Sequence, residues 1–158
     1  MLDGDARERQ VEQGIMDHLQ RFLVKSGVGF AFLGRQHRFE VDGDEFFIDL
    51  LFYHVKLRSY IVVELKATDF QPAYAGQLNF YVTAVNNLLR TPEDQPTIGL
   101  LLCRGKKTLV VEWALQGTNG AIGVAEYQLT NSIPVEFKGK LPTLKELEAE
   151  LGDAYDCE

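Results

Sequence analysis

The chain has 158 residues, of which 46% are hydrophobic and 25% charged, a composition typical of a globular protein and not of a disordered or fibrous one. Its 16 Lys and Arg residues stand against 23 Asp and Glu residues, and the net charge of −7 excludes a uniformly basic surface. The apolar runs are too short to span a bilayer and residues 1–5 are acidic, so we expect a soluble, cytoplasmic protein without a membrane partner.

The first part of the chain changes from a helical pattern to a strand pattern. A helix is predicted over residues 7–26, because apolar side chains recur at helical spacing and a glycine follows as a stop signal. The segments after it are rich in Phe, Ile, Val and Tyr. They predict strands over residues 29–33, 36–41, 45–54 and 59–67. Asp42, Gly43 and Asp44 form a tight-turn signal, and residues 55–58 join the last two strands.

The second part alternates helix and strand. Pro72 suits the first turn of a helix, and the apolar spacing predicts that this helix ends near Arg90. The remaining predicted elements are a strand over 97–104, a turn at 105–107 leading into 108–112, a strand over 122–128 and a last helix over 143–151. Thr143 and Glu146 form a capping box for that last helix. This order predicts an α/β fold with a mixed central sheet flanked by helices, as a single domain covering 1–158 with short flexible ends.

Three charged residues fall on the two strongest strands. Glu64 and Lys66 share one face of their strand, because side chains alternate across a strand. Asp49 and Glu64 are equally far from the middle of the turn at 55–58. A symmetric hairpin therefore places them directly opposite each other, with Cβ atoms roughly 4.5–5.5 Å apart.

Two carboxylates at that distance repel each other, and the apolar sequence around both adds a desolvation penalty. A divalent cation held by Asp49 and Glu64 would compensate, and oxygen ligands suit Mg²⁺ or Mn²⁺. Lys66 could neutralise charge and help to orient or deprotonate a metal-bound water. The alternative is structural: Glu64 and Lys66 pair on a solvated strand face, and Asp49 lies at a strand edge.

Asp49 followed after 15 positions by Glu64-Leu65-Lys66 resembles the active-site motif of the PD-(D/E)XK nuclease superfamily. The resemblance implies a restriction-endonuclease-like core. It further implies that Asp49 and Glu64 are metal ligands, that the Leu65 backbone carbonyl is another, and that Lys66 assists the attacking water. The proline that names the superfamily is replaced by Ile48, at a position that varies widely there.

Longer strings narrow the resemblance to the YhcG-like family of bacterial endonucleases. They are Gly-Phe-Ala-Phe-Leu-Gly-Arg-Gln (29–36), Phe-Ile-Asp-Leu-Leu-Phe-Tyr-His (47–54), Tyr-Ala-Gly-Gln-Leu-Asn-Phe-Tyr (74–81), Ile-Gly-Leu-Leu-Leu-Cys (98–103) and Gly-Val-Ala-Glu-Tyr-Gln-Leu (123–129). In that family the nuclease domain follows an N-terminal helical domain thought to bind DNA. Nothing in this chain corresponds to that domain, so the sequence resembles the C-terminal portion alone, and the missing part is an expected partner.

The resemblance also indicates residues on two helices. Gln77 and Tyr81, four positions apart on one helix face, are similar to a glutamine-to-tyrosine motif whose glutamine lies beside the active centre. Glu12 resembles an acidic residue that some branches contribute as an extra metal ligand, with Glu8 as a substitute. The structural alternatives are that Tyr81 belongs to the core and that Glu12 is an exposed helix residue.

Basic residues gather at three places: residues 35–38, Lys56 with Arg58, and Arg104 with Lys106 and Lys107. Each group is either a phosphate contact or a solvated loop end. The predicted substrate contacts are Arg35, Arg38 and Tyr81.

Together these residues predict a Mg²⁺- or Mn²⁺-dependent deoxyribonuclease that hydrolyses phosphodiester bonds through a metal-activated water. The first alternative is a non-catalytic DNA-binding module that keeps the fold. The second is a structural or dimerisation domain attached to a recombination or mobile-element protein. The sequence leaves open the structure of the DNA, endo- or exonuclease action, sequence specificity, activity of this portion alone, and oligomeric state, a homodimer included.

Overall fold

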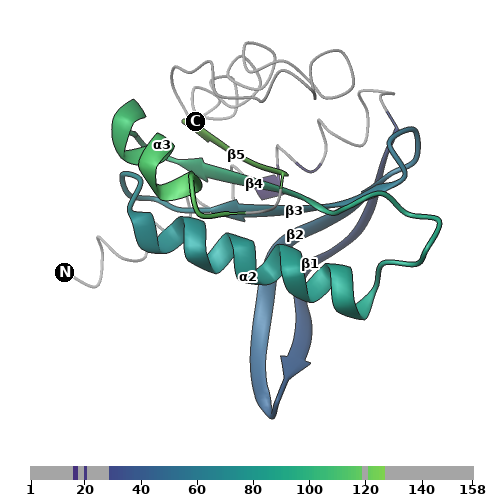
Figure 1. Cartoon of the computed structure of the whole chain (residues 1–158). Coiled ribbons are helices and arrows are strands. Elements are labelled where there is room, and N and C mark those ends of the chain that lie inside the picture. Colours follow the sequence, from purple (N-terminus) through teal and green to yellow (C-terminus); the bar gives the residue numbers. More distant parts are fainter. Residues whose placement is uncertain (1–15, 18–19, 21–28, 119–120, 127–158) are drawn as a thin grey trace.

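The computed structural model describes residues 16, 17, 20, 29–118 and 121–126, and it contains one five-stranded sheet with strand order β1-β2-β3-β4-β5 (Figure 1). The elements are β1 (Phe30–Val41), β2 (Asp44–His54), β3 (Ser59–Leu65), α2 (Pro72–Leu88), β4 (Ile98–Cys103), α3 (Thr108–Leu115) and β5 (Ala121–Glu126). The first three strands pair antiparallel, whereas β4 runs parallel to both β3 and β5. The predicted α/β fold with a mixed sheet flanked by helices is therefore confirmed.

One predicted boundary was wrong. Residues 30–33 and 36–41 lie in the single strand β1, because Gly34 marks a shift of register after Phe32 and not a turn. Residues 108–112 belong to helix α3, to which the sequence pattern assigned no element type. The predicted helix 7–26 is described only at Met16, Asp17 and Gln20, all helical, and the predicted helix 143–151 lies outside the described residues. In the part of the chain that is described, every helix is too short or too polar to cross a membrane.

Alternate residues of the central strands enter two hydrophobic clusters on opposite faces of the sheet. Leu50 and Val63 pack with Phe30 and Met16 on one face. Residues of the other parity pack against α2, which runs along the sheet (Figure 1). Gly99 in β4 allows this close approach, since a Cβ at that position would lie 2.8 Å from Cγ2 of Val82 in α2. Because Gly99 has no side chain, α2 can pack close to the sheet at this point.

The hairpin of β1 and β2 extends beyond the sheet as an arm (Figure 1). Its tip is the predicted tight turn, in which Asp42 and Gly43 have φ values of 53° and 89°. Ile48 and Leu51 both pack in the cluster against α2, although an undistorted strand would put residues three positions apart on opposite faces. β2 therefore twists between these two residues, and Asp49 lies at the twist.

Aromatic rings hold the base of the arm against α2. Phe39 of β1 stacks on Phe46 of β2 with ring centroids 5.3 Å apart. Phe46 in turn contacts Phe80 of α2 at 4.9 Å, and Phe39 meets Tyr81 edge to face at 5.5 Å. These contacts couple the twisted part of β2 to the helix that carries Gln77 and Tyr81.

Candidate active centre

Asp49 and Glu64 face each other where β2 and β3 separate. The last pair in the ladder between these strands is Leu50 with Val63, so the next two positions are Asp49 and Glu64. Asp49 N donates to Glu64 Oε2 at 2.8 Å, and Leu65 N donates to Asp49 Oδ2 at 2.8 Å. The predicted opposition of the two residues is confirmed, and each carboxylate accepts a backbone N–H from the opposite strand.

Gln36 explains why the Asp49 N–H is available to Glu64. The β1–β2 ladder pairs Arg35 with Leu50 and His37 with Ile48 but skips Gln36 and Asp49 between them. Gln36 has a φ of 48°, a left-handed conformation that is strained for a residue other than glycine. Its side-chain Nε2 donates to Asp49 Oδ1 at 3.1 Å.

The sequence reasoning missed Gln36. The available signal was its position: it lies opposite Asp49 if the hairpin closes at the turn through Asp42 and Gly43. The register from that turn to Gln36 is constant, and the shift between Phe32 and Gly34 lies beyond it.

Burial dominates the electrostatics of the pair. The Glu64 side chain is only 3% exposed. Burial, together with the neighbouring Asp49 charge, raises the pKa of Glu64 from 4.5 to about 8, against the opposing effects of its backbone hydrogen bond and of Lys66. The alternative in which Glu64 pairs with Lys66 on a solvated face is therefore wrong, because Glu64 is in the interior.

Lys66 follows β3 directly, and its backbone N donates to the Leu102 carbonyl of β4 at 2.8 Å. Its Nζ lies 5.1 Å from the centroid of the Tyr74 ring, a cation–π distance that holds the ammonium group against α2. Its positive charge lowers the pKa of Glu64, so the charge is felt at the carboxylates. The structure thus places the predicted trio of Asp49, Glu64 and Lys66 at one site.

Gln77 and Tyr81 lie on the same face of α2, as predicted, and Gln77 Nε2 donates to the Tyr81 hydroxyl at 3.2 Å. Tyr81 is 6% exposed and packs in the core, as the structural alternative for this residue supposed. The pKa of Tyr81 is raised mainly by burial and further by the charges of Glu64 and Asp49. Its hydroxyl is therefore both a core group and a neighbour of the carboxylate pair.

The predicted substrate-binding arginines are engaged in surface ion pairs. Arg35 pairs with Asp17, and Arg38 pairs with Glu45 at 2.8 Å and with Glu40 at 3.3 Å. Exposed pairs of this kind contribute little to stability, so they do not by themselves hold the side chains away from another anion.

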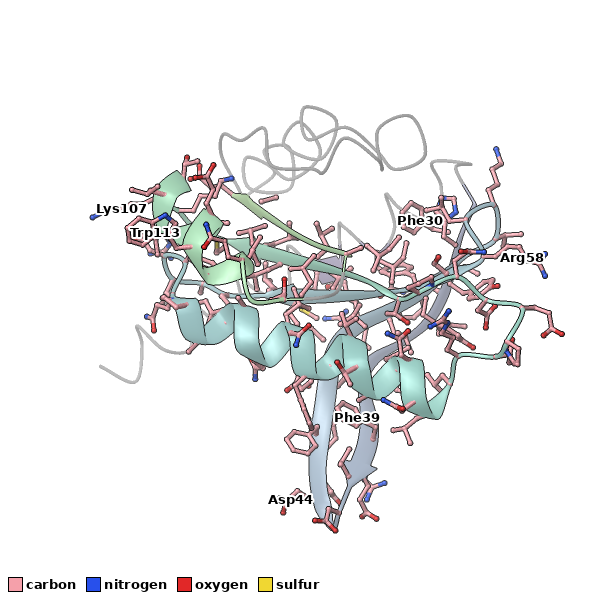
Figure 2. All side chains as sticks on the ribbon, viewed as in Figure 1. Phe30, Phe39, Asp44, Arg58, Lys107 and Trp113 are labelled. Atoms are coloured by element: carbon pink, nitrogen blue, oxygen red, sulfur yellow. The ribbon has the colours of Figure 1, made fainter. Side chains whose placement is uncertain are left out.

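The other basic groups lie at two ends of the sheet. Figure 2 shows Arg58, in the β2–β3 turn that also contains Lys56, at one end and Lys107 at the other. Glu12 and Glu8 lie outside the described residues. Among the described residues, no group of three or more His, Cys, Asp and Glu side chains is placed to hold a metal ion. A metal held there would therefore need backbone oxygens or water besides Asp49 and Glu64.

A family model described as the YhcG PDDEXK nuclease domain matches residues 1–142 of this chain. The Escherichia coli (strain K12) protein named "Putative nuclease YhcG" is 35% identical over 128 residues, which cover 81% of this chain and 34% of that protein. The chain thus spans about a third of the length of this curated relative.

Solved structures that match part of this chain include the EndoMS–dsDNA2 complex, at 16% identity and a TM-score of 0.48, over 68% of this chain and 42% of that one. A repair endonuclease from Pyrococcus abyssi matches at 14% identity with a TM-score of 0.44, over 68% of this chain and 43% of that one.

Proposed function

Because the chain belongs to the family of YhcG PDDEXK nuclease domains, we propose that it is a Mg²⁺- or Mn²⁺-dependent nuclease that hydrolyses phosphodiester bonds in DNA. The observation that carries this proposal is the pair of opposed carboxylates, Asp49 and Glu64, with the charge of Lys66 beside them. The buried Glu64 charge next to the half-buried Asp49 charge destabilises the protein unless a cation compensates them.

The donor set fits a hard divalent ion. Asp49 and Glu64 supply carboxylate oxygens on facing strands. The Leu65 N–H points toward Asp49, and in an extended residue the carbonyl points to the same strand edge, so the Leu65 carbonyl is a third proposed ligand. Oxygen ligands with water in the remaining positions suit Mg²⁺ and Mn²⁺. When bound, such an ion would polarise the phosphoryl group and lower the pKa of a coordinated water.

The protein side chains have distinct proposed roles. Asp49 and Glu64 hold the ion, and Gln36 fixes the orientation of the Asp49 carboxylate through its hydrogen bond. Lys66 orients the attacking water, takes part in its deprotonation and offsets negative charge on the phosphate. Gln77 is proposed to lie beside the reacting groups, and its hydrogen bond to the Tyr81 hydroxyl, whose pKa is raised by the charges of Glu64 and Asp49, supports this role.

Arg35, Arg38 and Tyr81 are the proposed substrate contacts. Arg35 directly precedes Gln36 in β1 and is proposed to bind a phosphate flanking the scissile bond. Arg38 is further along the arm, and Tyr81 could contact the substrate only through its hydroxyl because the rest of its ring is buried.

The proposal is tested by calorimetric titration with MnCl₂ and by cleavage of duplex, branched and single-stranded DNA in Mg²⁺ or Mn²⁺. The parent chain should bind Mn²⁺ and cleave at least one substrate, whereas Asp49→Asn should bind little Mn²⁺ and cleave none. Thr83→Ala, at an exposed position of α2, is the matched control and should behave as the parent. No heat with Mn²⁺ and no cleavage by the parent would instead favour a non-catalytic DNA-binding module.

Gln36→Asn is expected to weaken Mn²⁺ binding about tenfold or more, since outer partners of metal ligands typically change affinity 10–100-fold. Asparagine tolerates a positive φ, so the backbone is kept while the shorter amide no longer spans the 3.1 Å contact to Asp49. The measurement is the same titration, with His37→Asn on the adjacent residue as the control. Equal Mn²⁺ affinity in Gln36→Asn and the parent would show that the amide does not orient Asp49.

A further inference from the structure

The loop between β4 and α3 lies beside the segment that follows Lys66. Arg104 N donates to the Thr68 carbonyl at 3.0 Å, and Phe70 N donates to the Gly105 carbonyl at 2.7 Å. The parallel pairing of β3 with β4 brings both carboxyl ends to the same edge of the sheet. This loop therefore borders the edge at which the proposed active centre is built.

Arg104, Lys106 and Lys107 in this loop, with Leu109 and Trp113 of α3, form a surface that we name the basic edge. Arg104 and Lys107 are exposed, and Lys106 is half-buried. Trp113 is 67% exposed and Leu109 56%, and the two are four positions apart, so they lie on one helix face. Figure 2 shows Lys107 and Trp113 together at this end of the sheet.

Two acidic residues, Glu126 and Asp69, lie against the loop. Glu126 Oε1 accepts the Lys106 N–H at 2.9 Å. Asp69 packs against Gly105, with Oδ1 2.8 Å from the position that a Cβ would take. Glu126 is thereby occupied with the loop backbone, whereas Asp69 and Glu112 of α3 are exposed near the exposed cations Arg104 and Lys107.

The arm of β1 and β2 is acidic, unlike the basic edge. Its outer part carries Glu40, Asp42, Asp44 and Glu45, all exposed, and Arg38 is paired with two of them. Phosphates are repelled there, and Figure 2 shows Asp44 at the arm tip, well away from Lys107. Among the described residues, the basic edge is therefore more favourable for a polyanion than the arm.

We propose that a DNA strand leaving the active centre runs along the basic edge, with Arg104 and Lys107 contacting its phosphates and an unstacked base packing on Trp113. The assignment rests on the proposed nuclease function and gives it a substrate class: DNA with an unpaired strand next to the cleaved bond. An exposed indole beside cations is the arrangement by which proteins bind single strands, since every base has a face for stacking.

Trp113 is the only tryptophan in the sequence, so its fluorescence reports on this surface alone. The experiment titrates the protein in EDTA, where no cleavage occurs, with single-stranded, forked and blunt duplex oligonucleotides. Single-stranded and forked DNA should quench the emission more strongly and at lower concentration than the blunt duplex. By fluorescence anisotropy of labelled DNA, Trp113→Ala should weaken single-strand binding roughly tenfold, the usual effect of losing one stacked base.

Two double charge-reversal variants, one at each end of the sheet, are compared. Arg104→Glu with Lys107→Glu should weaken binding at least about tenfold and flatten its dependence on salt, because two phosphate contacts are lost. Lys56→Glu with Arg58→Glu changes net charge equally at the other end of the sheet and should change binding less than about twofold. Equal losses in both pairs, or no quenching by any oligonucleotide, would overturn the assignment.

A change of emission with protein concentration in the absence of DNA would also overturn it, and would assign the apolar part of the basic edge to a second copy of the chain. Binding here is measured without metal. Loss of cleavage with intact binding therefore contradicts only the nuclease proposal, and cleavage without Trp113 quenching contradicts only the strand path.

Discussion

Glu64→Gln is expected to make the metal-free protein more stable while abolishing its cleavage of DNA. Glutamine keeps the size of the side chain, can accept the Asp49 N–H that Glu64 accepts at 2.8 Å, and can donate to the Asp49 carboxylate. It removes a buried charge and the repulsion between the two acids. The gain at high pH should be several kcal/mol, since each unit of pKa shift corresponds to about 1.4 kcal/mol.

The size of the gain should depend on pH in a defined direction. The pKa of Glu64 is raised from 4.5 to about 8 in the folded protein, so the folded state holds this proton more tightly than the unfolded state does. Glu64 therefore contributes stability below pH 4.5, and this contribution is lost as pH rises through 8. Glu64→Gln should match the parent below pH 4.5, exceed it increasingly up to about pH 8 and keep a constant advantage above that.

Urea unfolding in EDTA across this range measures the difference directly. A constant difference between parent and variant would show that Glu64 titrates as a solvated acid. DNA cleavage by the same two proteins is then measured in Mn²⁺. Glu64→Gln should cleave DNA more than about a hundredfold more slowly than the parent, because even outer partners of metal ligands alter activity 10–100-fold. Wild-type cleavage by this variant would remove Glu64 from the site.

Metal should reverse the order of stability. In the parent, binding to the folded state adds stability that grows with pH, as protons and metal compete for the same carboxylate. In Glu64→Gln that increment should largely vanish. A functional carboxylate pair destabilises the metal-free protein and stabilises it once metal is bound, whereas a structural pair does not. Unfolding measurements with and without metal therefore report on the site without any substrate.

The opposition of Asp49 and Glu64 was predictable because a short, symmetric hairpin determines register, and register determines which side chains face each other. The burial of Glu64 was less predictable, because it depends on α2 packing over the sheet. Gly99, in the neighbouring strand β4, permits this packing. Local pattern carries no information about such a distant contact.

Three further features needed the three-dimensional structure. Gln36 reaches Asp49 through a positive φ that a sequence pattern does not encode for glutamine. Helix α3 contains Val110, Val111 and Trp113, residues that suit a strand as well as a short helix. The pairing of Arg35 with Asp17 was equally hidden, because it joins segments distant in the chain.

Lys66 is the residue whose position was predicted correctly and whose chemistry needs a separate experiment. Two replacements distinguish its roles: Lys66→Met removes the charge, and Lys66→Arg keeps a charge that does not deprotonate at accessible pH. Both side chains are long enough to pack on the Tyr74 ring, which contacts the lysine at 5.1 Å in the parent. Both variants should therefore fold, with urea midpoints close to that of the parent.

We expect both variants to lose cleavage by about a hundredfold or more, the range typical of a lost proton-transfer group, but only Lys66→Met to lose Mn²⁺ affinity. The reason is that the positive charge lowers the pKa of Glu64 and so favours the carboxylate that binds metal. Arginine retains that effect, but its broad guanidinium can neither take up a proton nor occupy the place of a compact ammonium. Near-parental cleavage by Lys66→Arg would assign Lys66 to charge neutralisation alone, and unchanged Mn²⁺ affinity in Lys66→Met would remove even that role.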